Sequence, residues 1–477
     1  MGVDNRQRPR ERLVRRSVGT QSRRLAISRP NAPRLPRFLS TPYVRISLFF
    51  GLLIALGTTL LLMPWATADG TTTDFITALF TATSASFVTG LILVETGEYW
   101  SIYGHLIILF LIEVGGLGYV AGLAIIIFGR ERRASLSDRQ SLRATLGGGS
   151  LGSVSQEAKE VIRISIVLQL IGFVVLIVGF LVAGHGPGEA GWFALFHSVS
   201  AFHNAGFDIT GGAPSLFEYR YSILVAGPIT MLSFIGATGA AILIVIYRQK
   251  RWLTLPLDVK VVIAGMVGVA AAGFIGILVT EWSNPATLGS QPIPNRIWDS
   301  LVMAVGNRTS GFSTFGVDQT YEHTLFLLIW LMLIGGAAGS MTGGIKINSF
   351  MVMFTSVLTS IRGLTHASIF GREIADVQVR RAITIASFAF VWVNSVALLL
   401  DIVEEAHFVE ILFDVVSAFG LVGLSTGTIP GMSDFGKSVI ILSMFVGRFA
   451  PFFLALELAH RERFTRFRYP EGEVRIG

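Results

Sequence analysis

The sequence predicts an all-α polytopic membrane protein built from four pseudo-symmetric helix–loop–helix repeats, with eight transmembrane helices in all. Three observations support this prediction: an apolar composition, eight long apolar runs, and a regular alternation of these runs with short stretches of small residues. Of the 477 residues, 52% are hydrophobic and 14% are charged, whereas soluble proteins carry about 25% charged residues. The composition therefore excludes a soluble enzyme, a nucleic-acid-binding protein and a disordered scaffold.

Residues 1–44 form a separate segment with eleven arginines, five prolines and no apolar run. A signal peptide has its apolar region soon after its basic start, so this segment does not match one. We expect a basic, disordered cytoplasmic tail in contact with anionic lipid; a docking site for a regulatory subunit is the alternative.

Eight apolar runs have about the 20 residues, or more, that a helix needs to cross a bilayer. They lie at residues 45–66, 101–129, 161–184, 219–247, 258–282, 324–360, 380–402 and 434–458. Between the members of each pair lies a shorter stretch rich in Ser, Thr, Ala and Gly, at residues 72–91, 190–208, 296–313 and 407–425. These stretches are too short to cross the membrane as a full helix with its loops.

The basic residues decide the path of the short stretches. Clusters of Arg and Lys follow the second, fourth, sixth and eighth runs, at residues 130–143, 248–251, 362–381 and 461–468. If the short stretches enter the membrane and return, all four clusters and the N-terminus lie on the cytoplasmic side, as the positive-inside rule requires. We therefore expect four re-entrant loops, cytoplasmic termini and a pseudo-symmetry axis along the membrane normal.

These patterns divide the chain into six units. After the N-terminal segment we expect four repeats, each with one pore loop, and the third also has an interrupted second helix. The repeats cover residues 45–135, 155–251, 256–365 and 378–460, and a cytoplasmic tail covers 461–477.

The four short stretches align on one glycine, and the aligned glycines are 116, 105 and 112 residues apart. A small residue stands five positions before each glycine, a serine precedes it in three copies, and a bulky apolar residue follows the glycine. The glycines are Gly90, Gly206, Gly311 and Gly423; the small residues are Ala85, Ala201, Gly306 and Ala418; the following residues are Leu91, Phe207, Phe312 and Leu424.

Ion dehydration explains such a pattern. Non-helical backbone at membrane depth is tolerated where it is buried or lines a water-filled cavity, and a ring of backbone carbonyls can replace the hydration shell of a cation. Glycine permits the unusual dihedral angles and the close approach that this requires. The alternative is that Gly and Ser only let helices pack closely, but four copies in register favour one central pore.

The loop sequences VTGL, HNAGF, RTSGF and VGLS resemble the pore loops of the Trk/Ktr/HKT superfamily of potassium transporters. EVGGLGY (Glu113–Tyr119), GGAAGSMTGGIK (Gly335–Lys346) and FVGRFAP (Phe445–Pro451) resemble stretches of its first, third and fourth inner helices. The resemblance covers residues 45–460. Eight spans place the chain nearer the Ktr membrane subunit than the ten-span Trk form.

The resemblance implies a selectivity filter of three residues from each loop, and a glycine at the key position of all four loops implies potassium selectivity. Serine in the first loop would imply sodium permeation. Phe87, Leu421 and Ser310 depart from the residues common in the family, which should alter packing behind the filter. The implied filter residues are Val88, Thr89, Gly90, Asn204, Ala205, Gly206, Thr309, Ser310, Gly311, Leu421, Val422 and Gly423.

Five glycines interrupt the sixth apolar run, and each costs a helix about 1 kcal/mol relative to alanine, so we expect the helix to break there. The resemblance implies an intramembrane gating loop below the filter; a flexible kink without a role is the alternative. The implied gate residues are Gly335, Gly336, Gly339, Ser340, Gly343, Gly344, Lys346 and, on the last helix, Arg448.

Ionisable groups within membrane spans are costly and are functional hypotheses by default. Glu113 replaces the amide of the family motif; we expect it to pair with Arg308, Lys346 or Arg448, or to face the cavity and attract cations. We expect Arg308 and His203 to brace the pore loops, and Asp414 and Asp299 to be pairing partners of buried charges.

Together these features predict a potassium-translocating membrane subunit rather than an enzyme, with no cofactor in this chain. The resemblance implies a homodimer in a bacterial inner membrane and a cytoplasmic ring of nucleotide-binding, KtrA-like regulatory subunits; it leaves open whether sodium stimulates transport. One rival is a sodium-permeable or sodium-coupled transporter of the same fold. Another is an intramembrane enzyme that uses Glu113, His203 and Asp208.

Overall fold

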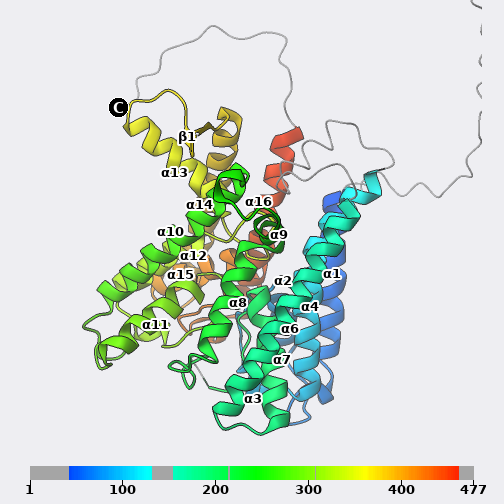
Figure 1. Cartoon of the computed structure of the whole chain (residues 1–477). Coiled ribbons are helices and arrows are strands. Elements are labelled where there is room, and N and C mark those ends of the chain that lie inside the picture. Colours follow the sequence, from blue (N-terminus) through cyan, green and yellow to red (C-terminus); the bar gives the residue numbers. More distant parts are fainter. Residues whose placement is uncertain (1–41, 132–153, 213–214, 307, 461–477) are drawn as a thin grey trace, which may run out of the picture.

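A computed structural model of the chain describes residues 42–131, 154–212, 215–306 and 308–460 (Figure 1). The described chain is mainly helical, with one small antiparallel hairpin of β1 (Ser368–Ile369) and β2 (Arg372–Glu373). The predicted tail at 461–477 lies outside the described residues, and so does the N-terminal segment except for its last three residues.

The first helix of each predicted repeat is long and unbroken. These helices are α1 (Pro42–Leu61), α6 (Val154–Val182), α10 (Leu257–Thr280) and α14 (Asp376–Val403). Each contains a segment long and apolar enough to cross a membrane: Val44–Leu61, Lys159–Val182, Leu257–Thr280 and Asp376–Val403. The chain therefore has several membrane-spanning helices, as its composition predicts.

The second helix of each predicted repeat is more varied. α4 (Ile102–Glu131) and α16 (Asp434–His460) are continuous, whereas α12 (Glu322–Leu333) and α13 (Ile347–Ile361) are separated by the glycine-rich segment, as expected. The fourth apolar run was predicted to be one helix, and this is wrong: α8 (Ala226–Thr238) and α9 (Ala240–Arg248) meet at an angle of 87°. Gly239, with φ +86°, forms the break. The eight-span arrangement stays a prediction.

Four short helices occupy the four predicted re-entrant stretches. They are α2 (Phe75–Phe87), α7 (Pro187–His203), α11 (Ile293–Gly306) and α15 (Phe408–Gly420), here called the pore helices. Local sequence explains where two of them begin. The Asp74 carboxylate accepts a hydrogen bond from Ile76 N at 3.0 Å and caps α2, and Pro187 starts α7 at a position where its missing N–H costs nothing.

Short elements complete the described chain. They are α3 (Thr96–Tyr99) and the 3₁₀ turns η2 (Pro64–Ala66), η3 (Trp252–Thr254), η4 (Val317–Gln319) and η5 (Ile429–Gly431).

The distribution of side chains is the reverse of that in a soluble protein, with apolar side chains exposed and polar side chains buried. On α6, the apolar side chains of Leu170, Val174 and Val178 are 50–60% exposed. Every residue from Phe80 to Phe87 on α2 is buried, although this stretch contains two threonines and two serines. An apolar exterior around a more polar centre is the arrangement that a lipid solvent favours.

The helices pack in a closed cycle. Each second helix packs against the pore helix of the next predicted repeat: α4 against α7, α8 against α11, α12 against α15, and α16 back against α2. In Figure 1 the red α16 accordingly lies close to the blue and cyan helices of the first repeat. The last quarter of the chain thus closes on the first.

Candidate functional site

The ends of the pore helices share an unusual backbone conformation. α2, α7 and α15 each end on a non-glycine residue in the left-handed region, namely Val88 (φ +60°), Asn204 (φ +61°) and Leu421 (φ +53°). Non-glycine residues are uncommon there and are often found at functional sites. Two residues later in each case comes one of the four aligned glycines, and all four glycines have φ between +68° and +98°.

The four glycines form a closed ring. A Cβ atom placed on any of them would lie less than 3.0 Å from a backbone carbonyl oxygen of the next loop, so only glycine fits without displacement. The contacts run in cyclic order: Gly90 to Ala205, Gly206 to Ser310, Gly311 to Val422, and Gly423 to Thr89. All twelve predicted filter residues therefore belong to four loops that touch one another around one ring.

Hydrogen bonds orient the loop carbonyls within this ring. In the first loop, Thr89 N donates to Ser84 O at 2.8 Å and Gly90 N donates to Ser84 Oγ at 3.1 Å. Because a trans peptide directs its C=O opposite to its N–H, the carbonyls of Val88 and Thr89 point away from the pore helix. Val422 N and Gly423 N make the same two bonds to Ser417 in the fourth loop, at 3.0 and 3.1 Å.

The second and third loops vary this scheme. Ala205 N donates to Ser200 O at 2.7 Å, while Ser200 Oγ donates to Phe207 O at 2.9 Å. In the third loop, where the preceding serine is absent, Ser310 N and Ser310 Oγ both bind Gly306 O, at 3.0 and 2.7 Å. Thr309 Oγ1 donates to Asn204 Oδ1 at 2.8 Å, which ties these two loops together.

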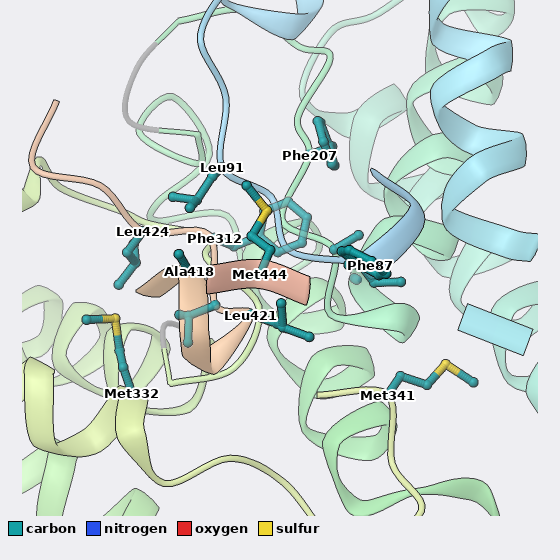
Figure 2. Close-up of a cluster of buried hydrophobic side chains, with 14 of the residues drawn as sticks. Phe87, Leu91, Phe207, Phe312, Met332, Met341, Ala418, Leu421, Leu424 and Met444 are labelled. Atoms are coloured by element: carbon teal, nitrogen blue, oxygen red, sulfur yellow. The ribbon is translucent and has the colours of Figure 1, made fainter. Parts of the chain in front are cut away.

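Apolar side chains fix the loops from behind. Figure 2 shows Leu91, Phe207, Phe312 and Leu424, the residues that follow the four glycines, in one buried cluster with Phe87 and Leu421. Each of the four is at most 3% exposed. Phe87 and Leu421, which depart from the family pattern, are completely buried, as expected for residues that pack behind the loops.

In three of the predicted repeats, a glycine of the second helix packs directly against the pore helix of the same repeat. A Cβ at Gly115 would collide with Ser86 O, one at Gly236 with Phe202 O, and one at Gly447 with Phe419 O. Each of these carbonyls belongs to the residue four positions before the aligned glycine of its loop. These glycines therefore set the distance between the second helices and the ring.

Polar braces hold the loops that leave the ring in the second and fourth predicted repeats. His197 Nε2 lies 3.0 Å from Asp208 Oδ1, which also accepts from Thr210 N at 2.7 Å. Asp414 accepts from Ser425 Oγ at 3.2 Å, from Thr426 N at 3.0 Å and from Thr428 Oγ1. Asp414 is thus paired with hydroxyl and amide donors, whereas no hydrogen bond to the Asp299 carboxylate is found among the described residues. His197 was missed, although it precedes Gly206 by nine residues, as Asp414 precedes Gly423.

The segment around α3 lies near the loop that follows Gly206. The carboxyl of Glu95, in the loop before α3, has its pKa raised by burial and then by the negative charges of Asp208 and Glu98. A Cβ at Gly97, in α3, would lie 2.8 Å from Ile209 O, so this segment lies directly against the loop that follows Gly206.

The glycine-rich segment between α12 and α13, residues 334–346, folds back on itself. Gly335 N donates to Ile345 O at 2.9 Å and Ile345 N to Leu333 O at 3.1 Å. Inside the loop, Thr342 Oγ1 binds Gly336 N at 2.7 Å and Ser340 Oγ at 3.0 Å, while Lys346 Nζ donates to Thr342 O. Gly339 and Gly344 have φ of +85° and +68°.

Three surrounding helices bind this loop. Ala337 N donates to Ala237 O at the end of α8 at 2.9 Å, and Gly343 N donates to Gly420 O at the end of α15 at 3.1 Å. Arg448 on α16 donates to Met341 O. The loop therefore lies against the end of a pore helix, and all eight predicted gate residues are in it or, like Arg448, bound to it.

The buried charges have partners that the sequence did not indicate. Glu113 Oε2 lies 2.8 Å from His203 Nε2, a pairing that was not among the three predicted. Arg308 Nη2 lies 2.7 Å from Met266 Sδ on α10, so Arg308 contacts the scaffold behind the third loop, consistent with a bracing role.

The enzyme hypothesis is not supported by this geometry. Glu113 and His203 are in contact, but Asp208 is engaged by His197 and Thr210 instead.

Comparison with known proteins identifies the family. The model of the TrkH family, described as a cation transport protein, matches residues 22–462. The chain belongs to the TrkH family. It is therefore a membrane cation transporter by family, and not a member of an enzyme family.

Relatives in this family cover nearly the whole chain. Ktr system potassium uptake protein B of Bacillus subtilis (strain 168) is 33% identical over 437 residues, which are 92% of this chain and 97% of the relative. Potassium/sodium uptake protein NtpJ of Enterococcus hirae is 33% identical over 445 residues, with the same coverages. The crystal structure of the potassium transporter TrkH from Vibrio parahaemolyticus matches with a TM-score of 0.68 at 20% identity, covering 90% of this chain and 86% of that one. This last match shows that the TrkH fold is shared.

Proposed function

We propose that this TrkH-family protein takes up potassium by channel-like permeation through a carbonyl-lined filter. The observation that carries the proposal is the closed ring of four glycines, each in contact with a carbonyl of the next loop. Such a ring can surround one ion, and its carbonyls can replace the water that the ion loses. The filter residues are the twelve predicted ones, Val88–Gly90, Asn204–Gly206, Thr309–Gly311 and Leu421–Gly423.

Backbone carbonyls, rather than side chains, coordinate the ion in this proposal. The bonds of Thr89 N and Gly90 N to Ser84 direct two successive carbonyls away from the pore helix. The partial negative charge at the C-terminal end of each pore helix adds to the attraction for a cation. Potassium is the proposed ion because all four key positions are glycine and because two of the relatives are named for potassium uptake.

The loop of residues 334–346 is the proposed gate. It is bound to the ends of α8 and α15 and to Arg448, and its glycines allow it to take up a second position. In the described structure it lies against the end of a pore helix, so opening would move it aside.

The proposed architecture has four repeats and eight spans around one pore, with the predicted repeat boundaries 45–135, 155–251, 256–365 and 378–460. The cyclic packing of second helices on pore helices supports it. We place the protein in the plasma membrane of a bacterium with both termini in the cytoplasm, as a homodimer. The name of a relative, Ktr system potassium uptake protein B, suggests a membrane subunit that works with a cytoplasmic, KtrA-like regulatory component.

A sodium-permeable or sodium-coupled transporter of the same fold is the second candidate. The observation that favours it is the name of one relative, a potassium/sodium uptake protein. A potassium-selective protein and this candidate differ in whether a sodium gradient drives or changes the ion flux.

Growth of bacteria that lack their own potassium uptake systems tests the proposal. Expression of the chain should restore growth at low potassium, and Gly423→Ala should weaken this growth because its Cβ would collide with Thr89 O. Gly427→Ala is the matched control, since Gly427 also has a positive φ, +88°, but no neighbour within 4 Å of its Cβ position. Equal growth of both variants would contradict the proposed filter.

A further inference from the structure

The ring of His203 is enclosed between three parts of the protein. His203 is the last residue of pore helix α7 and is completely buried. Its Nε2 lies 2.8 Å from Glu113 Oε2 on α4 and 2.9 Å from Gln169 Nε2 on α6. Gly116, one helical turn after Glu113, leaves room for the ring, because a Cβ there would lie less than 3.0 Å from it.

The other ring nitrogen of His203 faces the proposed gate. His203 Nδ1 lies 2.6 Å from Met341 Sδ, and Met341 is near the middle of the loop of residues 334–346. When one nitrogen of an imidazole is held by a carboxylate, the orientation of the ring and the role of the other nitrogen are fixed. Glu113 therefore determines how His203 meets Met341.

Two helices contact Met341, one at its backbone and one at its side chain. Arg448 on α16 binds its backbone carbonyl, and His203 on α7 contacts its side chain. Met341 is 4% exposed, so both contacts are shielded from solvent while the loop is docked.

Glu113 is polar where the corresponding positions of two other second helices are apolar. Glu113 precedes Gly115 by two residues, and the residues two before Gly236 and Gly447 are Phe234 and Phe445. His203 precedes Gly206 by three residues, where the first, third and fourth loops have Phe87, Arg308 and Gly420. A carboxylate within the membrane is costly unless it has a function, and general packing at position 113 would be served by phenylalanine, as in two of the other copies.

We propose that Glu113 and His203 form a latch that positions Met341 and so keeps the gating loop docked. Glu113 acts through His203, and His203 acts through Met341, so both are positioning residues. The latch rests on the proposed function of the loop as a gate. It predicts that loss of Glu113 frees the loop without changing the filter.

Potassium flux through the full-length chain in liposomes tests the latch. Glu113→Ala and Met341→Leu should each raise the flux about three- to tenfold with unchanged selectivity for potassium over sodium, because the loop undocks more often. The double variant should exceed neither single variant, since coupled residues are not additive. Glu113→Gln keeps a hydrogen-bonding partner for His203 and should stay near the wild type. Glu160→Ala is the matched control, because it removes a carboxylate from an exposed pair with Arg248.

Amide hydrogen exchange gives a readout that does not depend on transport. Exchange in residues 335–346 should be faster in Glu113→Ala and Met341→Leu than in the wild type and in Glu160→Ala. Unchanged exchange, additive effects, or a loss of selectivity in Glu113→Ala would overturn the latch. Absence of potassium flux in every form, with faster exchange in the two variants, would contradict the proposed function and leave the latch standing.

Discussion

At the scale of single residues, the ring depends on positions where a β-carbon does not fit. Gly90 has φ +89°, and a Cβ there would lie less than 3.0 Å from Ala205 O in the neighbouring loop. Since that carbonyl belongs to the proposed filter, crowding at Gly90 is transmitted directly to the groups that would bind the ion. A serine side chain at position 90 would therefore act by displacing this carbonyl.

Gly90→Ser should lower the ratio of potassium to sodium permeability by about tenfold, which corresponds to roughly 1.4 kcal/mol. Gly70→Ser is the matched control, because Gly70 also has a positive φ, +73°, but no atom within 4 Å of its Cβ position. Flux measured with opposed potassium and sodium gradients checks both variants. An unchanged ratio in Gly90→Ser would show that the first loop does not line the filter.

The sequence predicts the ring better than it predicts the buried pairs. The four glycines repeat at a regular spacing, and the resemblance to a known family supplied their meaning. Glu113 and His203 are 90 residues apart, and each had several acceptable partners in the sequence. Only the packing of α4 against α7 decides between them, because neither charge nor spacing favours one partner.

At the scale of elements, the second helices divide into continuous and broken ones. The break between α12 and α13 follows from five glycines in twelve residues and could be predicted. The break between α8 and α9 rests on Gly239 alone, within an apolar run that also suits a continuous helix. Contacts with the gating loop explain this second break. The Cβ position of Gly239 lies 3.5 Å from Ser340, and Ala337 N donates to Ala237 O at the end of α8.

Deletion of residues 339–343 should raise the potassium flux of the chain in liposomes severalfold. It removes Met341 and Gly343, which bind Arg448 and Gly420, but leaves the base of the loop, where Gly335 N and Ile345 O are 2.9 Å apart. Circular dichroism and the size of the protein in detergent serve as controls for folding. An unchanged or lower flux in a folded protein would argue against the loop as a gate.

At the scale of the whole molecule, the burial pattern and the cyclic packing have one common explanation. Apolar side chains on helices such as α6 face outward, while the buried centre holds pore helices and loops with their serines and carbonyls. The contact of α16 with α2 closes the cycle, so all four loops can contribute to one pathway. The composition predicted a membrane protein, with which the outward apolar surface agrees, and the repeat spacing predicted a pseudo-symmetric arrangement, with which the cyclic packing is consistent.

The most direct test of this account is ion flux in liposomes that contain the purified full-length chain alone, driven by a potassium or a sodium gradient. The account predicts flux driven by potassium that exceeds flux driven by sodium at least tenfold, and a further rise when residues 339–343 are deleted. Equal flux with both ions would contradict the potassium-selective filter. Absence of flux from both the intact and the deleted chain would contradict a pore in this chain.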